Sequence, residues 1–185
     1  MSYWMLIREA VQMLFAMLVN YQTCLALPMI QSIAHTICEH YYRHDAVKVL
    51  AGFVHVLKAD GFAFIRVPDL GELMRTVVEK NLDIDDFLYQ SPAGPITVRD
   101  VIYGYGVEVE RSGNDFFAHK TGFTQKSLMS ILKTAGFPWV FSGIGNLEVM
   151  ALAFSNKPNE HAEKLFHLPS HKQTNGSGLD MTVSG

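Results

Sequence analysis

A run of polar side chains, His35-Thr36-Ile37-Cys38-Glu39-His40, lies between apolar parts of the chain and could carry chemistry. The imidazole of His40 is the first candidate for a general base, because histidine takes up a proton near neutral pH. The carboxylate of Glu39 could orient that imidazole or bind a cationic substrate. This segment is therefore the first place where we expect a reactive site.

The same segment and its continuation contain four residues of the types that bind zinc: His35, Cys38, His40 and His44. Structural zinc sites prefer recognisable ligand pairs such as C-x₂-C. The order His-x-x-Cys-x-His-x-x-x-His has no such pair. We therefore predict no metal site. The alternative to the zinc interpretation is that these polar groups cap and satisfy a turn between a strand and a helix.

Three further polar residues are candidates for a catalytic role. His119 lies on a predicted loop before a helix, Tyr103 lies in a long connection, and Asp69 follows a predicted strand. Loops position functional groups, but they also need polar groups to form their turns. Both explanations stay open for each residue.

The composition excludes several classes of protein. The chain has 185 residues, 49% of them hydrophobic and 18% charged, and a formal net charge of -3. Lysine and arginine are scattered, so no basic stripe for nucleic acid is present. The two cysteines are too few for a disulfide framework, and we expect a reducing, cytoplasmic environment.

Predicted strands and helices alternate through the middle of the chain. Strands followed by helices favour a parallel sheet, and the last two strands, joined at Gly145-Asn146, form a predicted antiparallel hairpin. Asp45, Asp69 and Thr124 are the expected N-caps. The predicted strands are 30–37, 62–67, 138–144 and 147–154, the predicted helices are 45–57, 70–80 and 124–135, and residues 81–119 are predicted to be irregular.

Three regions follow from this pattern. Residues 1–29 are predicted to form an apolar helix that packs on the protein; a targeting segment or a membrane contact is the alternative. Residues 30–155 are predicted to form a partial α/β domain. Its sheet is expected to be mostly parallel and doubly wound, with the antiparallel hairpin at its end. Residues 156–185 are polar and predicted to be a flexible tail.

Several motifs in residues 30–155 resemble those of class I S-adenosylmethionine-dependent methyltransferases, in particular a bacterial subgroup of predicted methyltransferases. The segment 35–45 resembles a family pattern "SHNLEH-hydrophobic-x-x-HE", although Thr36 stands where the pattern has histidine. Val56-Leu57-Lys58-Ala59-Asp60-Gly61-Phe62 resembles "RVLKPGG", with His55 in place of its arginine. The other matching parts are 67–70, 91–96, Asp100, 102–104 and 118–124.

The resemblance implies transfer of a methyl group from S-adenosylmethionine to an acceptor that the sequence does not identify. It places the segment 35–45 after the fourth strand of the family fold, where the substrate meets the methyl end of the cofactor. It therefore assigns His35, Thr36 and Ile37 to the cofactor side. Glu39, His40 and His119 are then the leading catalytic candidates, before Tyr103 and Asp69.

The glycine-rich turn that holds the cofactor in this family has no counterpart before Gly52. We therefore expect a front half of the fold to be missing. Three hypotheses follow: a divergent enzyme, whose cofactor site another chain could complete; a non-catalytic interaction module that forms homo-oligomers through an open sheet edge; and a truncated gene product.

Overall fold

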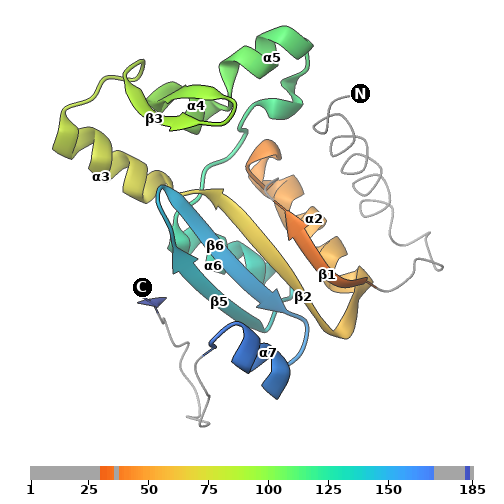
Figure 1. Ribbon diagram of the computed structural model, residues 1–185. Helices are drawn as coiled ribbons and strands as arrows, with labels where there is room; N and C mark the ends of the chain where they lie inside the picture. Colours follow the sequence, from red (N-terminus) through yellow and green to blue (C-terminus); the bar gives the residue numbers. More distant parts are fainter. Residues whose placement is uncertain (1–29, 36–37, 169–181, 184–185) are drawn as a thin grey trace.

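The computed structural model describes residues 30–35, 38–168 and 182–183. Its main element is a five-stranded sheet with the order β1-β2-β6-β5-β7, which runs diagonally across Figure 1. The strands are β1 (Ile30–His35), β2 (Leu57–Pro68), β5 (Trp139–Ile144), β6 (Glu148–Phe154) and β7 (Thr182–Val183).

The prediction of a mostly parallel, doubly wound sheet is wrong. The strand β6 lies between β2 and β5 and pairs antiparallel with both, and the two helices that pack on the sheet share one face. Among the described strands of this sheet, β1 pairs parallel with β2 and β5 pairs parallel with β7. The cause is the tight connection between β5 and β6, which makes them antiparallel neighbours. The second strand of this hairpin, and not the first, then pairs with β2. The antiparallel ladders therefore occupy the centre of the sheet.

Two helices cover the same face of this sheet, α2 (Arg43–Val56) and α6 (Gln125–Thr134), as Figure 1 shows. Alternate residues of the strands, such as Ile65 and Ala151, point into the layer between sheet and helices and are fully buried there. Phe53 of α2 and Leu132 of α6 fill that layer from the helix side. This core holds the ends of β1 and β2 in place.

The predicted helix starts are confirmed at two of three positions. Asp69 accepts hydrogen bonds from the amides of Gly71 and Glu72 and caps α3 (Leu70–Lys80). Thr124 and Ser127 form a capping box at the start of α6. The prediction for Asp45 is wrong, because α2 begins at Arg43. Asp45 therefore lies in its first turn, where its carboxylate pairs with Lys48.

The connection predicted to be irregular, 81–119, is largely regular. It forms a small unit that lies beyond one end of the sheet, at the top of Figure 1. Pro95 is tolerated because its strand belongs to a two-stranded hairpin and is not a central strand. The elements are β3 (Phe87–Ser91), β4 (Gly94–Thr97), α4 (Val98–Tyr103), α5 (Gly106–Ser112) and the 3₁₀ helix η3 (Asp115–Phe117).

The structure tests the predictions for the two ends of the chain only in part. The N-terminal apolar helix expected in residues 1–29 lies outside the described residues. Within the segment expected to be a polar tail, α7 (Glu160–Leu165) is helical, and the following Phe166 packs its ring on Phe62 and Phe154. No helix in the described part of the chain is long and apolar enough to cross a membrane.

Candidate active site

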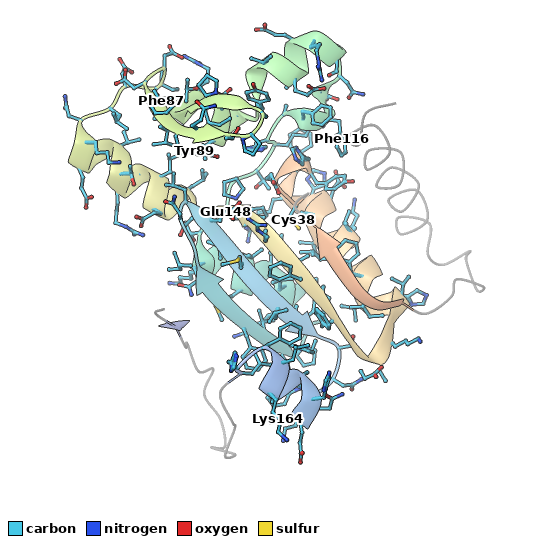
Figure 2. All side chains as sticks on the ribbon, in the orientation of Figure 1. Cys38, Phe87, Tyr89, Phe116, Glu148 and Lys164 are labelled. Carbon is cyan, nitrogen blue, oxygen red and sulfur yellow. The ribbon has the colours of Figure 1, made fainter. Side chains whose placement is uncertain are left out.

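The candidate site lies where β1 and β2 end, next to the small unit formed by β3, β4, α4 and α5. The 3₁₀ helix η2 (Cys38–His40) begins three residues after the end of β1 and carries Glu39 and His40. Figure 2 shows Cys38 and Glu148 at this end of the sheet, with Phe116 nearby. Because β1 and β2 are parallel, their carboxyl ends lie side by side here. Ligand sites in α/β sheets commonly lie at this end of the strands.

The side chain of Glu39 is buried without a full set of partners. The residue is 3% exposed, and its Oε2 atom has no hydrogen-bond partner among the described residues. Its backbone carbonyl is well held, accepting from the amides of Lys120 at 2.7 Å and Thr121 at 3.2 Å. Burial, with a smaller contribution from the charge of Glu148, raises the pKa of Glu39 to about 7, although its own amide opposes the shift.

His40 is held against the loop that precedes α6. Its Nδ1 atom lies 3.4 Å from the carbonyl oxygen of Ala118, and its ring stacks on Phe116 with the centroids 5.3 Å apart. Its Nε2 atom lies 3.9 Å from Oε1 of Glu39. Burial lowers the pKa of His40 to about 4, and the neighbouring His119 contributes to the same shift, so the ring is neutral near pH 7.

His119 reaches the same place from the far end of the small unit. Its Nδ1 atom lies 2.9 Å from the carbonyl oxygen of Val101, and its amide donates to the carbonyl of Tyr103 at 2.9 Å. Gly104, with a φ of 95°, brings the two chain segments together, and a Cβ atom there would lie 2.1 Å from the carbonyl oxygen of Phe117. Burial lowers the pKa of His119 as well.

Glu39, His40 and His119 therefore form one cluster, called here the Glu-His-His cluster. One nitrogen of each imidazole and one carboxylate oxygen lie within 4.8 Å of one another. Both Nδ1 atoms face backbone carbonyls, which require a donor there and leave each Nε2 as an acceptor. The cluster can take a proton from a nucleophile, and Glu39 is close enough to stabilise the resulting imidazolium.

Among the other predicted site residues, Tyr103 and Asp69 do not join this cluster. Tyr103 has an exposed side chain, and Asp69 is used by the cap of α3. His35 ends β1, where its backbone pairs with Ile65. Thr36 and Ile37 lie outside the described residues, so the cofactor role that the resemblance gives to 35–37 stays a prediction.

A cavity of about 260 Å³ opens beside the cluster, and His119 forms part of its wall. Tyr89, Tyr105 and Glu148 also line it, and sequence reasoning missed all three. Tyr89 and Tyr105 fall in the segment predicted to be irregular, and Glu148 lies in the hairpin, where only a strand was expected. The strand β3 and the start of β6 are distant in sequence and become neighbours only in the folded chain. No local spacing of residues would therefore have identified these three lining residues.

Comparison with known proteins gives matches at the level of structure alone. No family model and no curated protein matches the chain. Similar solved structures include an O-methyltransferase family protein from Burkholderia thailandensis, with 10% identity, 75% of this chain covered and a TM-score of 0.44. Human N-acetylserotonin methyltransferase in complex with SAM has 16% identity, 71% coverage and a TM-score of 0.40. PigF with SAH has 10% identity, 69% coverage and a TM-score of 0.37.

This chain spans about a third of each of those chains: 34% of the first, 31% of the second and 32% of the third. The similarity therefore covers only a part of each of those chains.

The described residues do not by themselves fit a whole S-adenosylmethionine molecule. The cavity is smaller than the ~300–1,000 Å³ usual for small-molecule sites. No glycine-rich turn joins a strand to a helix in the described part: β2 leads into α3 through Asp69, which itself occupies the free amides of the helix. What the described residues can supply is one side of such a site, around the Glu-His-His cluster.

Proposed function

We propose that this chain forms the acceptor side of an S-adenosylmethionine-dependent methyltransferase. The observation that carries this proposal is the meeting of two separate motifs. The segments 35–45 and 118–124 both resemble the methyltransferase subgroup, and their polar residues Glu39, His40 and His119 come together in one buried cluster. Two motifs that are distant in sequence and adjacent in space are what a shared site requires.

In this proposal the cluster prepares the acceptor. An acceptor hydroxyl, amine or thiol in the cavity donates its hydrogen bond to a free imidazole nitrogen, which takes the proton as the nucleophile reacts. His119 lines the cavity directly, and His40 lies behind it with Glu39 at 3.9 Å. Phe116, stacked on His40, limits water on that side. The acceptor is thus a small molecule or an exposed group that fits about 260 Å³.

The remaining contacts to the cofactor come, in this proposal, from outside the described residues or from a second copy of the chain. A second copy could join through β1, which pairs only with β2 among the described strands.

The test is methyl transfer by the full chain. The purified protein is incubated with S-adenosylmethionine labelled on its methyl group and a panel of small hydroxyl, amine and thiol compounds. We expect transfer to at least one class, reduced roughly 100-fold or more in His40→Gln and His119→Gln, the range of a lost general base. His44→Gln, whose side chain is 71% exposed, is the matched control and should be unchanged. Equal rates in all four proteins would refute the role of the cluster.

A second candidate function, a non-catalytic binding module, is favoured by the poor fit of the cofactor to the described residues. In such a module the same cavity binds a ligand without turnover. Binding of S-adenosylhomocysteine distinguishes the two proposals. An enzyme binds this compound, whereas a module that has lost the cofactor site does not.

A further inference from the structure

We propose that Glu39, His40 and His119 form a binding site for one divalent transition-metal ion, with Zn²⁺ as the best match. This inference goes beyond methyl transfer and does not depend on it, because it rests on the arrangement of three side chains alone. An ion bound to both imidazoles would occupy the nitrogens that act as bases in the proposed function, so the metal-bound state is distinct from the metal-free state that the proposed function describes.

The orientation of the two imidazoles is the first argument. Metal-binding histidines usually donate their second ring N–H to a backbone carbonyl or a carboxylate, which fixes the ring and leaves the other nitrogen for the ion. Both rings have this arrangement here: Nδ1 of His40 faces the carbonyl of Ala118, and Nδ1 of His119 faces that of Val101. Each ring is thus fixed through one nitrogen, and both histidines offer a nitrogen within 4.8 Å of the Glu39 carboxylate.

The unpartnered carboxylate oxygen is the second argument. Oε2 of Glu39 is buried and accepts no hydrogen bond from any described residue. Buried polar atoms without partners are rare in folded proteins, and each calls for an explanation such as a missing ion. One nitrogen of each imidazole and one carboxylate oxygen lie within 4.8 Å of one another, so these three groups surround a common space. A proton or a metal ion there would satisfy the carboxylate.

The surrounding charges favour a cation. Glu148 lies close enough to affect Glu39 and adds a second negative charge at the mouth of the site. Lys120 is the opposing charge near His40, but its ammonium group lies 3.3 Å from the carboxylate of Asp115. The carboxylates of Glu39 and Glu148 therefore outweigh the partly neutralised charge of Lys120, which favours a cation at this site.

The ligand types select the ion. Two imidazoles and one carboxylate suit Zn²⁺, Co²⁺ or Fe²⁺ and are poor ligands for Mg²⁺ and Ca²⁺, which prefer oxygen. Zinc takes nitrogen and oxygen at ~2.0–2.2 Å. Ligand atoms within 4.8 Å of one another would have to move inward by roughly 1 Å. Three protein ligands leave one position open, as in catalytic zinc sites, and the ligand His119 lines the cavity.

This ligand set differs from the run of zinc-binding residue types between positions 35 and 44. His44 points to solvent on α2 and pairs with Asp45 at 3.1 Å. Cys38 is buried, and burial raises the pKa of its thiol, which disfavours the thiolate that zinc needs. The site instead joins η2 with the loop before α6, a pairing that no short spacing motif describes.

The experiment is titration of the chelator-treated full chain with Zn²⁺ by calorimetry and with Co²⁺ by visible absorption, in the absence of S-adenosylmethionine. We expect one equivalent to bind, with affinity at least 10-fold weaker in Glu39→Gln and His119→Gln, the range for a damaged metal site. His44→Gln is the control and should bind as the unaltered chain does. Binding that is equal in all variants would be adventitious and would overturn the proposal, as would no binding.

A second measurement needs no variant, so it holds even if a substitution impairs folding. X-ray absorption of the Zn²⁺-loaded unaltered chain should show two imidazoles and oxygen around the ion. One imidazole, none, or a sulfur ligand would overturn the assignment. Neither measurement involves methyl transfer, so the outcome is independent of the proposed function.

Discussion

The imidazole rings of His40 and His119 meet edge to face, with centroids 5.1 Å apart and planes at 63°. His40 follows the first described strand, and His119 follows the small unit beyond the sheet. The contact exists because the loop before α6 returns to η2, where the amides of Lys120 and Thr121 donate to the carbonyl of Glu39. The backbone that joins the two segments thus also assembles the cluster.

Gly104 should be essential to this assembly. Its φ of 95° disfavours any residue with a Cβ atom, and that atom would lie 2.1 Å from the carbonyl oxygen of Phe117. We expect Gly104→Ala to lower the free energy of unfolding by about 2 kcal/mol or more, from the strained backbone and the displaced loop. Gly143→Ala is the control, since nothing lies within 4 Å of its added Cβ, and it should change stability by less than about 0.5 kcal/mol. Equal effects in urea unfolding would contradict the role of Gly104.

The ionised carboxylate of Glu39 should destabilise the folded protein. Its pKa is raised from 4.5 to about 7 in the folded protein, so the folded state binds the proton more tightly than the unfolded state does. Its contribution to stability is therefore greatest below pH 4.5 and is lost as the pH rises through about 7. The unaltered chain should lose stability relative to Glu39→Gln between pH 5 and pH 8, by on the order of 1–3 kcal/mol.

Urea unfolding of both proteins at the two pH values, without metal, measures this difference. Glu79→Gln, at an exposed position on α3, serves as the control for the substitution itself. A gap between the unaltered chain and Glu39→Gln that stays constant or narrows as the pH rises would show that Glu39 is not buried as described.

Asp100 should have the opposite pH dependence. Burial acts to raise its pKa, but hydrogen bonds from the Gly106 amide and from Thr97 outweigh burial and lower it. A lowered folded pKa gives stability that is present above the unfolded value of 3.8 and is lost as the pH falls through the folded pKa. Asp100→Asn should therefore be less stable than the unaltered chain at pH 6, and the gap should close in acid. Thermal unfolding across this pH range decides it, and a gap that widens in acid would count against this account.

Local sequence signals predicted the elements whose cause is local. Asp69 and Thr124 were recognisable as caps because capping depends on residues within three positions of each other. Asp45 was misleading because Tyr42, which has no side-chain cap, occupies the actual N-cap position. A cap without a hydrogen-bonding side chain leaves no signal in the sequence.

The order of the strands could not be predicted in the same way. Both strands of the hairpin, β5 and β6, are apolar enough to pair with β2, so periodicity does not say which of them does. The structure selects β6, whose residues Val149, Ala151 and Ala153 present small side chains to the layer under α2 and α6. Packing of distant elements decided the sheet order, and the mostly parallel prediction failed for that reason.

The candidate site was predictable as a set of residues but not as a geometry. Residue type and resemblance identify Glu39, His40 and His119, and the structure brings them together. They do not identify Phe116, which stacks on His40, or the cavity residue Tyr89, because the positions of both depend on how the small unit packs beyond the end of the sheet. Figure 2 shows these two aromatic side chains at that end of the molecule.

The most direct test of the methyltransferase proposal is calorimetric titration of the full chain with S-adenosylhomocysteine, accompanied by measurement of its oligomeric state. The account predicts saturable binding with one ligand per chain at a Kd tighter than about 1 mM, a binding free energy beyond about −4 kcal/mol. No heat of binding at millimolar ligand, from monomer or oligomer, would contradict the proposal and leave the cavity and its Glu-His-His cluster to a binding module.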